Sequence, residues 1–107
     1  MKQFFVYIVR CDDGSYYTGI TNDARRRAGE HNFGIDTRCY TYTRRPVELV
    51  YAADFSDVND AIRWEKQIKG WSRRKKEALI ADDWEGVRRN ARTRASTALG
   101  RPSTGSG

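Results

Sequence analysis

Two short runs of β-branched and aromatic residues, joined by a turn sequence, constrain the fold of this chain more than any other feature. The first run reads FFVYIV at residues 4–9, and the second reads SYYTGI at residues 15–20. The segment between them contains Asp12-Asp13-Gly14. Strand-forming residues on either side of an Asp-Gly turn are typical of a β-hairpin.

The length of the hairpin loop decides which side chains share a face of the sheet. A two-residue type I′ turn at Asp13-Gly14 and a three-residue loop with Gly14 in the left-handed conformation both fit the sequence. The three-residue loop pairs Tyr7 with Gly19 and makes Tyr7 and Tyr17 diagonal neighbours on one face, about 7–8 Å apart. The two-residue loop turns the two tyrosines to opposite faces.

A helix and a third strand are expected after the hairpin. The helix runs through residues 25–27 to His31 and ends at residues 32–34, which finish in glycine. Its N-cap is one of three neighbouring polar residues, Thr21, Asn22 or Asp23. The third strand covers residues 47–51, directly after a proline that suits the start of a strand.

Two further helices complete the predicted order, ββαβαα. The second helix begins after an N-cap at Ser56 or Asp57 and ends at residue 69, before a glycine. The third helix begins after Ser72 and ends near residue 81. Trp84 and Val87 mark the last segment that we expect to pack on the domain.

The composition suits one folded domain over residues 1–90. The chain has 107 residues, of which 38% are hydrophobic and 12% aromatic, and it contains three tryptophans. This is more bulky core material than a disordered chain carries, and the length leaves no room for a second core. Residues 91–107, rich in Gly, Ser, Thr and Arg, are expected to form a basic, flexible C-terminal tail.

The positive charge of the chain is gathered in clusters. The formal net charge is +6, and residues 86–107 alone hold five arginines and no acidic residue. Clusters at residues 25–27, 44–45 and 73–76 predict contacts with nucleic-acid phosphates, although each cluster alone could be a solvated charged face. The candidate nucleic-acid-binding residues are Arg25, Arg26, Arg44, Arg45, Lys69, Arg73, Arg74, Lys75 and Lys76.

Several classes of protein do not fit the sequence. The longest apolar run, residues 4–9, is far shorter than the roughly 20 residues that cross a bilayer, and it resembles a secretory signal poorly. We therefore expect a cytoplasmic monomer with no membrane contact. Cys11 and Cys39 are expected to be thiols, and a structural zinc site lacks ligands because His31 is the only histidine.

Glu65 is out of place in the second predicted helix. The apolar stripe of that helix consists of Val58, Ala61, Ile62 and Ile68. Glu65 falls in the middle of this stripe, where an unpaired carboxylate would cost on the order of several kcal/mol. The position calls for a cation, a metal ion or a polar cleft. Alternatively, Glu65 lies at the edge of the stripe and pairs with Arg63, Lys69 or solvent.

An ordered set of residues resembles the GIY-YIG nuclease superfamily, and within it the small stand-alone bacterial YhbQ-like proteins. The set begins with VYI at residues 6–8 and YTG at residues 17–19. It continues with Arg27 and His31 on the first helix and Glu65 on the second. Further matching stretches are residues 11–23, 26–27, 30–32, 45–51 and 64–73, so that the likeness covers about residues 3–81.

The chain departs from the family pattern at three points. Val6 stands where the motif has its first glycine, and Thr18 stands where the second triplet has isoleucine. Strand side chains tolerate both changes. The C-terminal asparagine that several family enzymes use has no secure counterpart here, because Asn90 lies outside the clear motifs.

The resemblance implies an α/β (α+β) domain, with a three-stranded antiparallel sheet flanked by helices. It implies an endonuclease that hydrolyses DNA phosphodiester bonds with a divalent metal ion, Mg²⁺ or Mn²⁺. Because no fused recognition domain is present in the sequence, we expect structure-directed or weakly sequence-specific cutting, on branched, nicked or damaged DNA. The alternative is a module that binds DNA or RNA and has lost catalysis.

Roles for five residues follow from the resemblance. Glu65 would bind the metal ion. Tyr7 and Tyr17 correspond to the motif tyrosines, one of which would orient or deprotonate the attacking water. Arg27 would contact the scissile phosphate and stabilise its growing charge. His31, one helical turn later, would hydrogen-bond a tyrosine or share the proton transfer.

Overall fold

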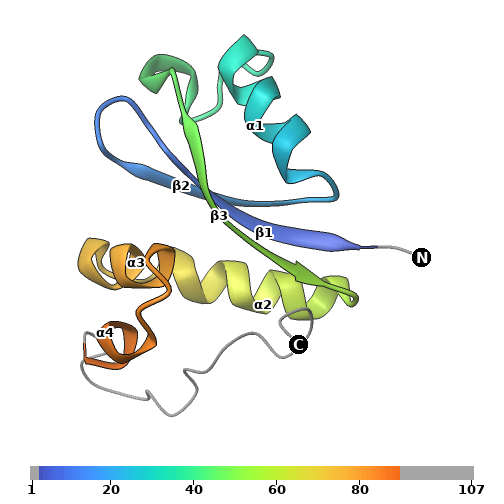
Figure 1. Cartoon of the computed structure of the whole chain (residues 1–107). Helices are drawn as coiled ribbons and strands as arrows, with labels where there is room; N and C mark the ends of the chain where they lie inside the picture. Colours follow the sequence, from blue (N-terminus) through green and yellow to red (C-terminus); the bar gives the residue numbers. More distant parts are fainter. Residues whose placement is uncertain (1–2, 90–107) are drawn as a thin grey trace.

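The computed structural model describes residues 3–89 of the chain (Figure 1). The expected tail at residues 91–107 and Asn90 lie outside this part. The strands are β1 (Phe4–Arg10), β2 (Tyr16–Thr21) and β3 (Glu48–Phe55). The helices are α1 (Ala24–Phe33), α2 (Val58–Lys69), α3 (Arg73–Ile80) and α4 (Trp84–Arg89), with a 3-10 turn, η1 (Tyr42–Arg44), before β3. The α+β class is confirmed.

The three strands form one antiparallel sheet in the order β2-β1-β3. The hairpin has the three-residue loop, because Tyr7 pairs with Gly19 and Gly14 has a left-handed φ of 86°. The Cys11 amide bonds the Ser15 carbonyl at 2.8 Å and closes the loop. The register with both tyrosines on one face is therefore confirmed.

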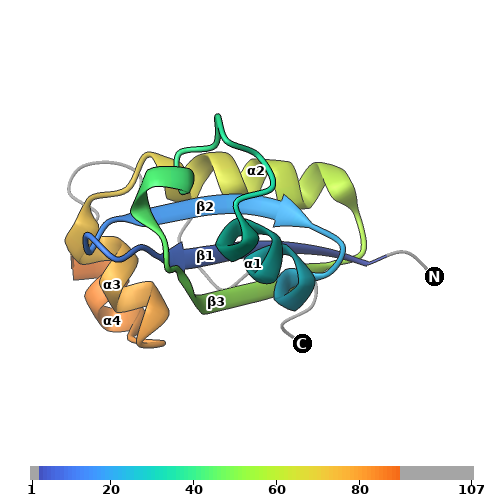
Figure 2. The same ribbon diagram turned by 90° about the horizontal axis from the view of Figure 1, so that it is seen from above.

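The sheet separates two layers of helix. Helix α1 covers one face, and α2, α3 and α4 lie on the other (Figures 1 and 2). Alternate residues of β1 serve the two layers: Val6 and Ile8 pack toward α2, while Tyr7 and Val9 pack toward α1. Val6 is fully buried in this core, which explains why an apolar residue is accommodated at the first motif position.

The predicted helix boundaries are confirmed, and the caps have clear partners. The Asp23 carboxylate accepts a hydrogen bond from the Arg26 amide at 3.1 Å, and Gly34 ends α1 with a φ of 71°. Asp57 caps α2 and Ser72 caps α3. No helix within residues 3–89 is long and apolar enough to cross a membrane.

Strand β3 is longer than the sequence predicts. It continues past residue 51 to Phe55 and pairs with the whole of β1, as far as Phe4. A bulge opposite Ile8 and Val9 shifts the register. Before the bulge Leu49 packs toward α1, and after it Phe55 packs toward α2. Because the bulge adds one residue, side chains of β3 change faces there, and the regular alternation of inward and outward residues along the strand is broken.

A short fourth helix, absent from the predicted order, follows α3. The side chain of Asp83 accepts a hydrogen bond from the Gly86 amide at 2.9 Å and starts the helix. Trp84 stacks near Trp64, with ring centroids 6.4 Å apart, and Val87 is fully buried. The expected packing of Trp84 and Val87 is thus present, on a helix too short to show a periodic pattern.

Candidate active site

Tyr7, Tyr17 and His31 form an aromatic cluster between the sheet and α1. Their ring centroids lie 6.4 Å apart for the two tyrosines and 5.3 Å apart for Tyr17 and His31. The Tyr7 hydroxyl lies 2.9 Å from Nε2 of His31. Tyr7 and His31 are almost fully buried, at 1% and 4% exposed, whereas Tyr17 is half-buried.

The hydrogen bonds around His31 define its neutral form. Nδ1 lies 2.8 Å from the Thr41 hydroxyl, which itself donates to the sulfur of Cys39 at 3.4 Å. Thr41 therefore accepts from His31, so we assign the proton to Nδ1. Nε2 is then free to accept the hydroxyl proton of Tyr7. Thr41 is 1% exposed and holds the imidazole in this orientation.

Arg27 joins the cluster from α1. The charge of its guanidinium acts on the buried Tyr7 phenol, and Nη1 pairs with Glu30 at 3.0 Å. The Arg27 side chain remains 31% exposed. A guanidinium that acts on a buried phenol and is partly exposed to solvent is placed to contact a phosphate from outside.

Burial controls the proton affinities in this cluster. Burial, followed by the neighbouring Tyr17, raises the pKa of Tyr7 to about 12. Burial and then the charge of Arg27 lower the pKa of His31. At neutral pH the phenol therefore keeps its proton, and the imidazole is an uncharged acceptor beside it.

Gly19 makes room for the cluster. A Cβ at this position would lie 2.6 Å from the Tyr7 hydroxyl oxygen and 2.8 Å from Cζ of the same ring. The Tyr7 ring crosses the backbone of β2 at this point, so any side chain would displace it. The glycine of the YTG triplet is explained by this close approach.

Tyr17 is covered by the segment between α1 and η1. The Tyr40 ring stacks on it, with centroids 6.2 Å apart, and the Arg44 guanidinium lies 3.8 Å from the centroid of Tyr40. Burial and then Cys39 raise the pKa of Tyr17. Burial opposes ionisation of Cys39, but hydrogen bonds from Thr41 and Tyr17 outweigh it and lower the pKa of this thiol.

Glu65 lies at the edge of the buried stripe of α2. The residues of α2 that face the core are Ala61, Trp64 and Ile68. Val58 and Ile62 are 37% and 36% exposed, so the predicted stripe is wrong at these two positions, because Trp64 takes the central place. The Glu65 side chain is 13% exposed, and Oε2 lies 2.6 Å from Nζ of Lys69. Glu65 therefore follows the alternative given in the sequence analysis, in which it lies at the edge of the stripe and pairs with Lys69.

Lys69 connects Glu65 to the tyrosines. It lines a pocket together with Tyr17, and the charge of each side chain acts on the pKa of the other. The hydrogen bond that Lys69 donates to Glu65 raises the pKa of Lys69. Glu65 lies one helical turn before Lys69 on α2, on the opposite face of the sheet from α1.

Glu65 could hold a divalent ion only if ligands other than His, Cys, Asp and Glu side chains complete its coordination. Within residues 3–89, no group of three or more His, Cys, Asp or Glu side chains could hold a metal ion. Mg²⁺ often keeps several waters and is bound by one or two carboxylates plus substrate phosphates. A single carboxylate such as Glu65 fits this pattern when waters and a substrate phosphate complete the ligand set.

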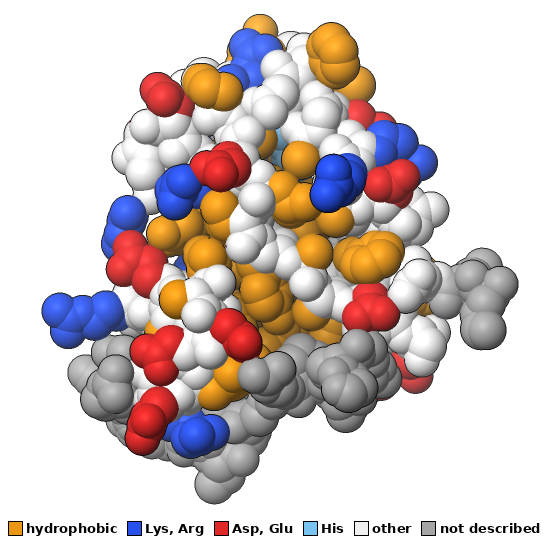
Figure 3. Space-filling view, viewed as in Figure 1, with side chains coloured by type: hydrophobic (Ala, Val, Ile, Leu, Met, Phe, Trp, Pro, Cys, Tyr) orange, Lys and Arg blue, Asp and Glu red, His pale blue; other side chains and the backbone are white. Residues whose placement is uncertain are grey.

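Most basic clusters are partly neutralised by acidic neighbours. Figure 3 shows basic and acidic side chains interspersed on the face that carries β3. The pairs are Arg26 and Arg27 with Glu30, Arg44 with Asp13, and Arg73 with Glu77. Arg25 and Arg74 are exposed, and Arg45 is exposed with its guanidinium 4.4 Å from the Tyr42 ring centroid.

Lys75 has a different environment from its neighbours. It is 7% exposed, and its ammonium lies 4.2 Å from the ring centroid of Trp71. Burial lowers the pKa of Lys75. This side chain packs on the tryptophan and offers little surface to a phosphate. Lys76 is half-buried and lines the pocket beside Tyr17.

Three residues of the site were missed by the sequence reasoning. Thr41 orients His31, Tyr40 covers Tyr17, and Thr18 lines the pocket with a buried hydroxyl. The only signal for Tyr40 and Thr41 is the concentration of Thr, Arg and Tyr in the loop that precedes β3. The sequence signal for Thr18 was that a threonine replaces the isoleucine of the family motif at this position.

Comparison with known proteins agrees with this arrangement. The model of the GIY-YIG catalytic domain matches residues 3–78. A UPF0213 protein of Staphylococcus saprophyticus is 44% identical over 82 residues, which cover 77% of this chain and 99% of the relative. A UPF0213 protein of Halobacterium salinarum is 49% identical over 75 residues, covering 70% of this chain and 96% of the relative.

Two solved structures share the fold. The solution structure of a UPF0213 protein from Bacillus halodurans is 39% identical, with a TM-score of 0.50 over 85% of this chain and 99% of the other. A protein from E. faecalis, EF2693, is 33% identical, with a TM-score of 0.54 over 77% of this chain and 86% of the other.

The strands and helices thus define a small α+β domain. The chain belongs to the GIY-YIG family, whose members are generally nucleases. The predicted resemblance is confirmed, and the small UPF0213 relatives occur in an archaeon as well as in bacteria.

Proposed function

We propose that this protein is a metal-dependent endonuclease that hydrolyses DNA phosphodiester bonds. The observation that carries the proposal is the hydrogen bond from the Tyr7 hydroxyl to the unprotonated Nε2 of His31, with Arg27 beside it. In this arrangement the neutral imidazole can accept the proton of the phenol, and the guanidinium can bind a phosphate.

Tyr7 acts as the proton acceptor for the attacking water. With its pKa near 12, Tyr7 does not hold a phenolate at neutral pH. It takes the proton from water as it passes its own hydroxyl proton to Nε2 of His31. The water oxygen then forms its bond to phosphorus, and the bond to the leaving oxygen breaks. Tyr17 closes the other side of the cluster and orients the strand.

Arg27 couples substrate binding to this proton transfer. In the free protein its guanidinium acts electrostatically on the Tyr7 phenol, which is almost fully buried. A phosphate that draws the guanidinium outward uncovers the phenol hydroxyl for the attacking water. The same contact stabilises the negative charge that grows on the phosphoryl oxygens.

Glu65 supplies the protein ligand for Mg²⁺ or Mn²⁺. A divalent ion bound there would offset charge on the phosphate and on the leaving oxygen. Glu65 must first exchange its contact with Lys69, because the two side chains are paired at 2.6 Å. The remaining ligands would be waters and phosphate oxygens.

The proposed substrate is branched, nicked or damaged DNA, cut with little sequence preference, in the cytoplasm and by a monomer. The support for weakly specific cutting is the small size of the domain and the exposed side chains of Arg25, Arg45 and Arg74, which suit contacts with backbone phosphates rather than base edges. Such a role suits DNA repair.

Strand cleavage with purified full-length protein tests the proposal. Glu65→Gln should reduce Mg²⁺-dependent cleavage of branched and linear DNA about a hundredfold or more. Glu48→Gln is the matched control, because Glu48 is exposed and pairs with Arg10 at the start of β3. Equal cleavage by the wild type and the Glu65→Gln protein would defeat the proposal and indicate a contaminating nuclease.

A nucleic-acid-binding module without catalysis is the second candidate. The observation that favours it is the Lys69–Glu65 pair, which already neutralises the carboxylate. This candidate predicts salt-sensitive binding of DNA or RNA without metal, and no product with any divalent ion. Metal-dependent scission by the wild type that is lost in Glu65→Gln would exclude it.

A further inference from the structure

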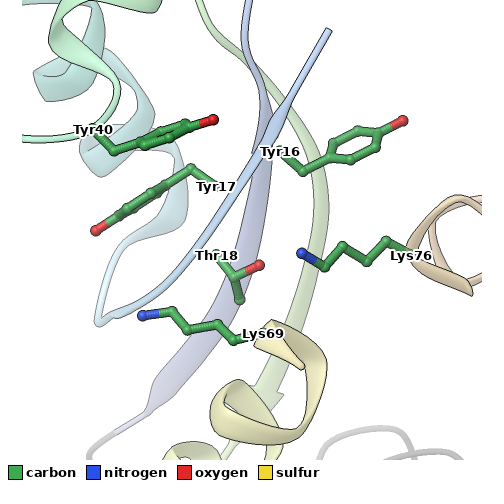
Figure 4. Close-up of a pocket in the computed structure, with 6 residues that line it drawn as sticks. All are labelled: Tyr16, Tyr17, Thr18, Tyr40, Lys69 and Lys76. Atoms are coloured by element: carbon green, nitrogen blue, oxygen red, sulfur yellow. The ribbon is translucent and has the colours of Figure 1, made fainter. Parts of the chain in front are cut away.

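A pocket lies beside the aromatic cluster, where the free edge of β2 meets α2 and α3. It has a volume of about 260 Å³ and is lined by Tyr16, Tyr17, Thr18, Tyr40, Lys69 and Lys76. Figure 4 shows Thr18 between the side chains of Lys69 and Lys76, which come from two different helices. Among the described residues, its lining contains amines and hydroxyls but no carboxylate.

The two lysines give this pocket an excess of positive charge. Lys69 pairs with Glu65, which lies outside the lining. Lys76 is half-buried and has no ion-pair partner within residues 3–89. Burial and then the charge of Lys69 lower the pKa of Lys76, as expected for a partly buried cation near a second cation. An anion in the pocket would relieve this repulsion.

Thr18 adds an independent observation. It is 3% exposed, and its Oγ1 is a buried oxygen without a hydrogen-bond partner in the described part of the chain. Burying a hydroxyl without a partner costs folding free energy, so such groups in proteins call for an explanation. The hydroxyl can donate, and its lysine neighbours can only donate. The partner that satisfies all three groups is an acceptor with negative charge.

We propose that this pocket binds one phosphate group of a nucleic-acid strand, held by Lys69, Lys76 and the hydroxyl of Thr18. The proposal rests on the proposed function, because Tyr17 lines both this pocket and the catalytic cluster. A phosphate bound here fixes the strand whose neighbouring phosphate reaches Arg27. The group is either a backbone phosphodiester or the terminal phosphate of a nicked strand.

Equilibrium binding of fluorescent single-stranded DNA to the full chain, in EDTA, tests this subsite without requiring catalysis. Two oligonucleotides of one sequence are compared, with and without a 5′-phosphate. Lys76→Gln should weaken binding about tenfold and Thr18→Val about fivefold. Lys66→Gln is the control for lost charge, because Lys66 is exposed on α2 outside the lining.

The two oligonucleotides distinguish the sources of the phosphate. Equal losses on both strands assign the pocket to a backbone phosphodiester, and a loss confined to the 5′-phosphorylated strand assigns it to a terminal phosphate. If Lys76→Gln and Thr18→Val bind both strands as tightly as Lys66→Gln, or if the wild type binds neither, the subsite is wrong. A protein that binds as expected but cleaves nothing with Mg²⁺ overturns the proposed function alone.

Thr18→Val also gives a readout that does not depend on DNA. It removes the hydroxyl and nearly keeps the shape of the side chain. The variant should melt at a higher temperature than the wild type when no ligand is present, because the unpartnered group is gone. Inorganic phosphate should raise the melting temperature of the wild type more than that of the variant. An equal response to phosphate would contradict a contact with Thr18.

Discussion

At the scale of single residues, the site depends on one missing side chain and one uncharged imidazole. Gly19 leaves space for the Tyr7 ring to cross β2, and that crossing brings the hydroxyl to His31. His31 can accept a proton only while it is neutral, and burial favours the neutral form. Both features are local, and both can be tested without any knowledge of the substrate.

Gly19→Ala should destabilise the protein by about 1–3 kcal/mol, because the new methyl group would meet the Tyr7 ring. Gly29→Ala is the matched control. Nothing lies within 4 Å of a Cβ at Gly29, and alanine should stabilise the interior of α1 by about 1 kcal/mol. Urea unfolding followed by circular dichroism measures both. A Gly19→Ala protein as stable as the wild type would show that the close approach is not present.

His31 should make the stability of the fold sensitive to mild acid. Its pKa is lowered in the folded protein, so the unfolded chain binds a proton more readily as the pH falls below the ordinary value of 6.5. The stabilisation is therefore complete above that value and is lost as the pH falls through the folded pKa. His31 is the only histidine, so comparison with His31→Gln isolates the effect.

Urea unfolding at neutral and at mildly acidic pH measures this difference. The advantage of the wild type over His31→Gln should shrink on acidification. An advantage that grows at lower pH would mean that the folded state favours the imidazolium, contrary to the neutral acceptor proposed here.

At the scale of elements, the sequence predicts helices better than strand ends. Asp23, Asp57 and Ser72 are local signals, and each caps the helix that it precedes. The extent of β3 depends on pairing with β1 and on a bulge at Ile8 and Val9. Such pairing is a long-range property, so no local pattern could place the end of the strand.

Asn32 joins two elements that the site requires. Its side chain accepts from the Val47 amide at 2.6 Å and donates to the Val47 carbonyl at 2.9 Å, tying the end of α1 to the start of β3. Asn32→Ala leaves both backbone groups without these partners and should cost about 1–3 kcal/mol in unfolding experiments. Asn59→Ala, at an exposed position of α2, is the control. Equal stabilities of the two variants would contradict this role.

At the scale of the whole molecule, the candidate site draws on both faces of the sheet. Arg27 and His31 come from α1, while Glu65 and Lys69 come from α2, and Figure 2 shows these two helices on opposite sides of the sheet. Lys69 lines the pocket beside Tyr17. The motif residues could be predicted because their order along the chain is specific. Thr41 could not, because its role depends on how the loop before β3 folds over α1.

The central claim is that Tyr7 and Glu65, on opposite faces of the sheet, act on the same phosphodiester bond. Single-turnover cleavage rates of Tyr7→Phe, Glu65→Gln and the double variant test it directly. Each single change should slow cleavage about a hundredfold or more, and the double variant should be about as slow as the slower single one, because residues that act as a unit are not additive. Losses that multiply in the double variant, or a Glu65→Gln protein that cleaves at the wild-type rate, would contradict the claim.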